Sequence, residues 1–173
     1  MATYKKGFKK QNTEMLLLKT IVAVIVAVIL IVAIAFIYDS MTKWRDYSNY
    51  DTITKYEDAF AMKDAEGVEL SDYVIYVYSD TCEGCQTIKD DLLKIANKFD
   101  DDKFFLMNIS KMTGEELEAK QADFLEIIER TSVATPMLVT VNDGNFEELF
   151  VGSTTVVQTL ASIEENTYAP FLE

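Results

Sequence analysis

Cys82 and Cys85 are the residues of this chain whose types and spacing are best suited to chemistry. They are its only two cysteines in 173 residues, and only Glu83 and Gly84 separate them. A Cys-x-x-Cys pair can close a small disulfide ring at the start of a helix, where the helix N-terminus favours the thiolate that attacks other disulfides. The pair therefore predicts thiol–disulfide exchange, and a purely structural disulfide is the alternative.

Other kinds of site are disfavoured by composition. A zinc site needs about four ligands, and two cysteines with no histidine do not supply a usual one. We therefore expect no metal and no cofactor.

Residues 1–38 hold five of the 16 basic and one of the 29 acidic residues. The remainder therefore holds 11 basic and 28 acidic residues, a formal charge of −17. That field repels phosphates, so we expect no nucleic-acid partner.

An apolar run from Ile21 to Ile37 contains no charge and no proline. Extended by Thr20 and Tyr38 it has 19 residues, and a helix of that length is roughly 28 Å long, enough to cross a hydrocarbon core. The basic residues that precede it place the N-terminus in the cytoplasm and the rest of the chain on the far side by the positive-inside rule. They are Lys5, Lys6, Lys9, Lys10 and Lys19.

A cleaved signal peptide is the alternative for this segment, because Ala33-Ile34-Ala35 resembles a cleavage site. The run is longer than a usual signal core of about 7–15 residues, which favours an uncleaved anchor. The predicted organisation is a basic cytoplasmic tail (1–19), a transmembrane helix or signal anchor (20–38), a stalk (39–50) and one domain (51–173).

Aromatic residues in the stalk have two interpretations. Trp44, Tyr47 and Tyr50 lie close after the apolar run, where aromatic side chains often mark the membrane interface. Packing against the domain is the equally favoured alternative.

Strands and helices alternate in the domain. The continuous apolar and aromatic run 72–78 predicts a buried strand, and the Cys pair stands between it and the amphipathic helix 86–99. This order predicts a parallel core with helices on both faces and an antiparallel hairpin at its edge, with the pair at the C-terminal end of a strand. The other predicted elements are helices over 51–63, 115–131 (with a Thr113–Glu116 capping box) and 153–166, and strands over 103–109, 137–141 and 146–151.

Three features together resemble the thioredoxin-fold family over about residues 51–168: YVIYVYSDT-CEGC leading into a helix, Thr135-Pro136 before a strand, and Phe150-Val151-Gly152 at the hairpin's end. The resemblance implies a three-layer α/β sandwich with a mixed sheet. Cys82 is then the exposed nucleophile, and Cys85, one turn into the helix, resolves the mixed disulfide. Pro136, cis in the family, implies a substrate-docking edge at Thr135.

The sequence departs from that family at several positions. Tyr76 stands where thioredoxin has a buried carboxylate. Strong oxidants of the family carry a histidine between the cysteines, and this chain has none there. Asp80 and Glu83 place negative charge near the sulfurs, which disfavours a thiolate, so we expect an intermediate or reducing potential. The approach YS-x-x-C-x-x-C resembles small exported thioredoxin-like proteins, including bacteriocin transport accessory proteins. The tuning residues are Tyr76, Asp80, Glu83 and Gly84.

The sequence thus predicts a membrane-tethered, extracytoplasmic oxidoreductase that exchanges protein thiols and disulfides. A membrane or extracytoplasmic redox partner must regenerate it, because one turnover exhausts the pair. The alternative is a non-catalytic accessory or chaperone subunit of a secretion system, whose disulfide is structural. A peroxide-reducing relative is disfavoured, because the chain has no further cysteine.

Overall fold

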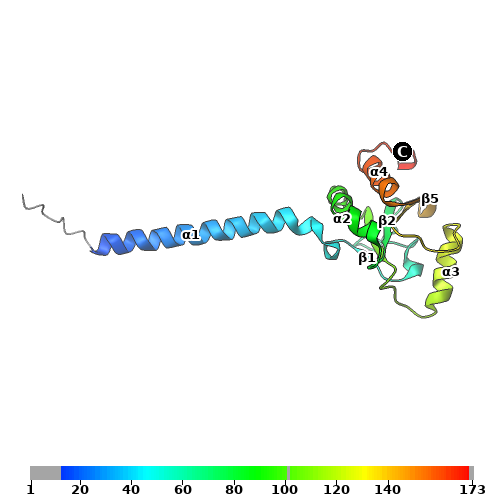
Figure 1. Ribbon diagram of the computed structural model, residues 1–173, viewed down its shortest axis with the longest axis horizontal. Coiled ribbons are helices and arrows are strands. Elements are labelled where there is room, and N and C mark those ends of the chain that lie inside the picture. Colours follow the sequence, from blue (N-terminus) through cyan, green and yellow to red (C-terminus); the bar gives the residue numbers. More distant parts are fainter. Residues whose placement is uncertain (1–12, 101, 172–173) are drawn as a thin grey trace, which may run out of the picture. The chain divides into compact units, whose positions relative to one another are not determined.

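The computed structural model describes residues 13–100 and 102–171, in two compact units, Met1–Lys43 and Trp44–Glu173. The first unit contains one helix, α1 (Thr13–Thr42), which Figure 1 shows as a continuous rod. Its part from Met15 to Tyr38, 24 residues, is long and apolar enough to cross a membrane, a property that signal sequences share. The helix extends past the predicted 20–38 at both ends.

The second unit is built on a five-stranded mixed sheet. Its strands are β1 (Thr52–Ile53), β2 (Tyr73–Tyr78), β3 (Phe104–Asn108), β4 (Met137–Asn142) and β5 (Asn145–Val151), in the order β1-β3-β2-β4-β5. β3 pairs in parallel with both β1 and β2, whereas β4 pairs antiparallel with β2 and β5. The predicted parallel core and antiparallel hairpin are confirmed.

Helices cover both faces of this sheet. α2 (Glu83–Ala96) and α4 (Ser153–Glu164) lie side by side over one face, and α3 (Leu117–Ile127) lies over the other (Figure 1). Side chains alternate along β2, so Tyr76 faces α2 whereas Ile75 faces α3. All six β2 residues are buried, as expected for a central strand covered on both sides.

Two local predictions are wrong. Residues 51–63 form no helix: Thr52 and Ile53 pair with β3, and a single 3-10 turn follows at Tyr56–Asp58. The apparent helical spacing arose because strand residue Ile53 and turn residue Tyr56 both point into the core. The capping box also fails, because the Thr113 hydroxyl donates to the Thr54 carbonyl and α3 begins only at Leu117.

Residues 44–50, which we call the strap, pack against the α2 face of the sheet rather than standing apart from the domain. The Tyr50 hydroxyl donates to the Leu93 carbonyl of α2 at 2.9 Å. The Lys89 ammonium lies 4.7 Å from the ring centre of Tyr47, within cation–π range. The aromatic residues of the strap are therefore half-buried side chains that pack against the domain's core.

Candidate active site

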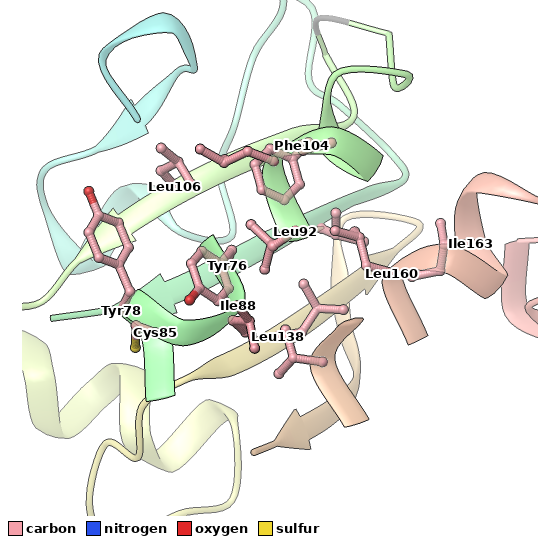
Figure 2. Packing of buried hydrophobic residues seen from close by; sticks show 14 of the residues in the cluster. Tyr76, Tyr78, Cys85, Ile88, Leu92, Phe104, Leu106, Leu138, Leu160 and Ile163 are labelled. Atoms are coloured by element: carbon pink, nitrogen blue, oxygen red, sulfur yellow. The ribbon is translucent and has the colours of Figure 1, made fainter. Parts of the chain in front are cut away.

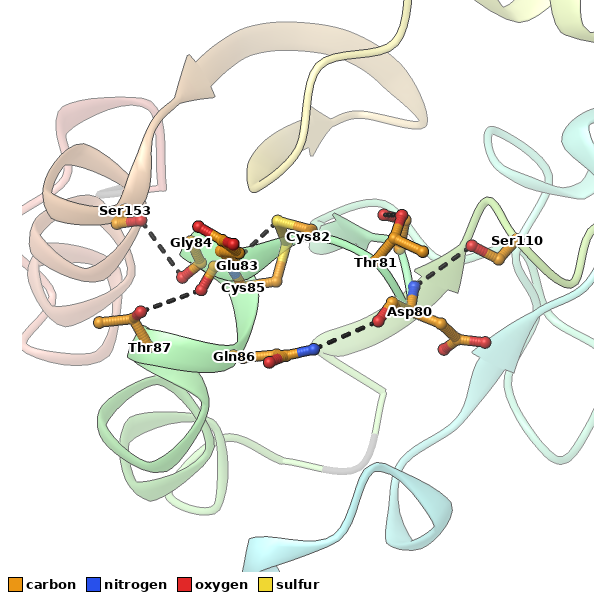
Figure 3. Close-up of a disulfide and its surroundings, with 11 residues drawn as sticks. Asp80, Thr81, Cys82, Glu83, Gly84, Cys85, Gln86, Thr87, Ser110 and Ser153 are labelled. Atoms are coloured by element: carbon orange, nitrogen blue, oxygen red, sulfur yellow. Dashed lines mark hydrogen bonds between the residues drawn. A yellow bond between two sulfur atoms is a disulfide. The ribbon is translucent and has the colours of Figure 1, made fainter.

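The two cysteines form a disulfide at the start of α2. Cys82 occupies the N-cap position with an extended backbone, and its sulfur accepts the Cys85 backbone N–H at 3.0 Å (Figure 3). A donor at the positive end of a helix stabilises negative charge on that sulfur. Cys82 is 8% exposed and Cys85 2%. Cys82, the predicted nucleophile, is thus the more accessible of the two cysteines, but in the disulfide form it is buried rather than exposed as predicted.

Gly84 brings the cysteine turn against the proline loop and α4. A β-carbon built at Gly84 would lie 3.1 Å from Pro136 Cδ and 2.9 Å from the Ser153 hydroxyl. That hydroxyl donates to the Gly84 carbonyl at 3.3 Å (Figure 3). Ser153 was predicted only as a helix opener, and nothing in the sequence indicates its contact with a residue 69 positions away.

The proline loop lies beside the disulfide with a free backbone edge. The Thr135–Pro136 peptide bond is cis, Pro136 is buried and Thr135 is half-buried. Pairing between β4 and β2 begins only at Met137, and the Pro136 carbonyl accepts the Gly152 N–H at 3.0 Å. Among residues 13–100 and 102–171, nothing hydrogen-bonds to the Thr135 backbone. An extended peptide can therefore pair at that position by strand addition.

Of the two acidic residues predicted to act on the sulfurs, Glu83 lies next to them and Asp80 points away. Glu83 is exposed in the first turn of α2, next to Cys82. The Asp80 side chain is directed away from the sulfurs (Figure 3). Its carboxylate accepts the Asn108 amide at 2.8 Å and lies 3.7 Å from the Lys111 ammonium. The structure thus brings Glu83 to the cysteines but turns the Asp80 charge toward the end of β3.

Tyr76 lies in the same buried cluster as both cysteines and is fully inaccessible (Figure 2). Burial raises its pKa, so the side chain is neutral and does not act as a base as a carboxylate does. Its hydroxyl and that of Tyr47 in the strap are buried without a hydrogen-bond partner among the described residues. Burial likewise raises the pKa of Tyr47 to about 12. The sequence reading missed Tyr47 here, because spacing does not reveal a contact between the strap and β2.

Metal binding finds no support in the part of the chain that the structure describes. No group of three or more histidine, cysteine, aspartate or glutamate side chains there is arranged to hold a metal ion. The chemistry that the site offers is that of its two sulfurs.

The chain is similar to solved structures only at low sequence identity. No protein-family model matches the chain, and no curated protein has significant sequence similarity to it. Oxidised mitochondrial thioredoxin 3 of Saccharomyces cerevisiae is 18% identical, with a TM-score of 0.47 over 69% of this chain and 97% of that one. Oxidised thioredoxin O2 of Arabidopsis thaliana is 19% identical, with a TM-score of 0.46 over 69% and 94%. The chain's own strand order, disulfide position and cis-proline loop define a thioredoxin-like α/β fold.

Proposed function

We propose that this protein is a membrane-tethered thiol–disulfide oxidoreductase that acts on protein substrates outside the cytoplasm. The observation that carries the proposal is the Cys82–Cys85 disulfide at the first turn of α2, in contact with the cis-Thr135–Pro136 loop through Gly84. In this proposal Cys82 is the reactive cysteine, Cys85 resolves the mixed disulfide, and the Thr135 backbone beside them binds the substrate peptide.

Exchange proceeds through a mixed disulfide. A substrate thiolate attacks the Cys82 sulfur, the bond between the cysteines breaks and Cys85 leaves as a thiolate. A second substrate thiolate then attacks the substrate sulfur of the mixed disulfide and displaces Cys82. The substrate loses two electrons and becomes a disulfide, while the pair gains them and becomes a dithiol. The reverse sequence reduces a substrate disulfide, with Cys82 attacking and Cys85 resolving.

Two features of the site assist these steps. The Cys85 N–H, 3.0 Å from the Cys82 sulfur, stabilises a thiolate there when Cys82 attacks or leaves. The free Thr135 backbone aligns an extended substrate segment beside the sulfurs. A redox partner in the membrane or outside the cytoplasm must reset the pair after each turnover.

The tether and its orientation are supported by composition and helix length. The apolar part of α1, Met15–Tyr38, is long enough to span a bilayer, and five lysines before its apolar centre favour a cytoplasmic N-terminus. A membrane-impermeant thiol reagent applied to intact cells after mild reduction tests this. Labelling of the cysteines supports the orientation, whereas labelling only after lysis contradicts it.

Trapping tests the oxidoreductase activity. In the Cys85→Ala variant, Cys82 attacks but nothing resolves the mixed disulfide, so we expect protein adducts that reducing agent releases. The matched control is Cys82→Ala, which leaves only the shielded cysteine and should trap far less. Equal, negligible trapping by both variants would instead support a structural disulfide in a non-catalytic accessory subunit, an alternative favoured by the low exposure of both sulfurs. The resemblance to bacteriocin transport accessory proteins stays a prediction of the sequence.

A further inference from the structure

Two buried hydroxyl groups near the disulfide lack hydrogen-bond partners. Among the described residues, the side-chain oxygens of Tyr47 and Tyr76 are the only buried side-chain nitrogen or oxygen atoms without one. Buried polar groups are almost always paired, so two orphan hydroxyls in one cluster call for a physical account. One account is that they find their partner in another state of the protein.

The two tyrosines belong to one aromatic stack between the strap and β2. The Tyr47 ring centre lies 4.3 Å from that of Tyr78 and 6.4 Å from that of Tyr76. The rings of Tyr76 and Tyr78 are parallel at 5.6 Å. The two hydroxyls face each other, and their mutual side-chain contact lowers the pKa of Tyr47 and raises that of Tyr76, although it does not have the geometry of an ordinary hydrogen bond. Burial is the main cause that raises the pKa of both. Both are therefore neutral hydroxyls with a proton to donate.

The redox turn packs over the same face of the sheet. Tyr76, Cys82 and Cys85 belong to one buried cluster. Figure 2 shows the hydroxyl end of Tyr76 directed toward the turn of α2 that carries Cys85. Tyr78, by contrast, points its hydroxyl toward the β3 side of the sheet, where Asn108 interacts with it.

The sulfur of Cys85 changes its hydrogen-bonding capacity when the disulfide opens. In the disulfide it is a poor acceptor. As the leaving group it becomes a thiolate at a position that is 2% exposed. A charge produced in a buried place needs a donor close by, and hydrogen bonds to charged groups are stronger than those between neutral groups.

We propose that the Tyr76 hydroxyl donates a hydrogen bond to the Cys85 sulfur once the disulfide opens, and that Tyr47 positions Tyr76 for this. The inference rests on the proposed function, because it concerns a pair that cycles between disulfide and dithiol. In the disulfide state the two hydroxyls have only their weak contact with each other, and in the dithiol state Tyr76 gains a charged partner. The pair of tyrosines thus favours the dithiol form. No electron or proton leaves the tyrosines, and the thiolate later takes its proton from solvent.

The test compares the redox equilibrium of four forms of the full-length protein in detergent micelles: wild type, Tyr76→Phe, Tyr47→Phe and the double variant. Each is equilibrated with glutathione buffers, and the free thiols are alkylated and counted by mass spectrometry. For Tyr76→Phe we expect the equilibrium to shift about tenfold toward the disulfide, which is about 30 mV for this two-electron couple. Tyr47→Phe should shift it less in the same direction, and the double variant should match Tyr76→Phe because the residues act as a unit.

Tyr78→Phe is the matched control, because it removes a hydroxyl from the same aromatic stack that points toward the β3 side of the sheet and away from the turn that carries Cys85. It should leave the equilibrium within about twofold of wild type. The inference is overturned if Tyr76→Phe and wild type have the same equilibrium, or if Tyr78→Phe shifts it as much as Tyr76→Phe. If Tyr76→Phe does not fold, the Tyr47→Phe variant tests the proposal instead. A redox equilibrium of Tyr47→Phe equal to that of wild type also overturns the proposal.

This experiment is independent of the trapping experiment. Glutathione equilibrates with the pair without any protein substrate. A tenfold shift without trapped substrates would therefore contradict the oxidoreductase function alone, and trapped substrates without a shift would contradict the role of the tyrosines alone.

Discussion

Gly84→Ala tests the closest contact at the site. The added β-carbon would lie 2.9 Å from the Ser153 hydroxyl and 3.1 Å from Pro136 Cδ. The hydroxyl can rotate away, but only by losing its hydrogen bond to the Gly84 carbonyl. The proline ring is rigid, so the turn itself must move away from the loop.

The expected loss of stability in Gly84→Ala is the sum of two destabilising contributions and one stabilising contribution. Overpacking a well-packed site costs about 1–3 kcal/mol, and the lost hydrogen bond costs about 0.5–1.5 kcal/mol. The alanine returns at most about 1 kcal/mol through its higher helix propensity. We therefore expect the free energy of unfolding of the disulfide form to fall by about 1–3 kcal/mol.

Urea unfolding of the full-length protein in micelles measures this change, with the fluorescence of Trp44, the only tryptophan, as the signal. Asp90→Ala, an exposed site on the same helix, is the control and should change stability by less than about 0.5 kcal/mol. Combining Gly84→Ala with Ser153→Ala should recover part of the loss, because the second change removes one of the two clashes. A Gly84→Ala protein as stable as wild type would refute the reasoning.

Further predictions concern charge, the strap and pH. Glu83→Gln should raise the thiolate fraction of the reduced nucleophilic cysteine at neutral pH, seen as faster alkylation, whereas Asp80→Asn should change it little because that carboxylate is turned away. Tyr50→Phe should lower the free energy of unfolding by about 1 kcal/mol, measured in urea, because the Leu93 carbonyl loses one of its two donors and keeps only the Asn97 N–H. Raising the pH from 10 to 12 should lower stability progressively in urea titrations, because burial raises the Tyr47 pKa to about 12 and the unfolded chain loses that proton near pH 10; constant stability over that interval would contradict the burial of this hydroxyl.

The elements that carry the site were predictable because their signals are local. The run 72–78 is apolar enough to specify a central strand, and Asp143 and Gly144 adopt the positive φ angles that a tight hairpin turn requires. The segment 51–63 was mispredicted because a two-residue strand is too short to show an alternating pattern. Its pairing with β3 depends on residues more than fifty positions away.

Within the candidate site, the sequence indicated the cysteine pair, the proline loop and several tuning residues, but not the tertiary contacts around them. The cysteine pair and Pro136 carry motifs, whereas Ser153 and Tyr47 reach the site only through tertiary contacts. The direction of the Asp80 side chain depends on Asn108 and Lys111 at the end of another strand. Such contacts follow from the three-dimensional packing of distant elements, and no spacing in the chain reports them.

These placements change which groups set the balance between disulfide and dithiol. Glu83 disfavours a thiolate on Cys82, but its carboxylate is exposed and water screens its field. Cys85 and Tyr76 are both buried where little water enters, so the hydrogen bond that we propose between them has the larger effect. The sequence alone favoured an intermediate or reducing couple, because two acidic residues lie near the cysteines and no histidine lies between them. With Asp80 turned away and Tyr76 as the proposed donor to Cys85, we expect Tyr76→Phe to change the equilibrium more than Glu83→Gln, a ranking that glutathione titration of the two variants measures directly.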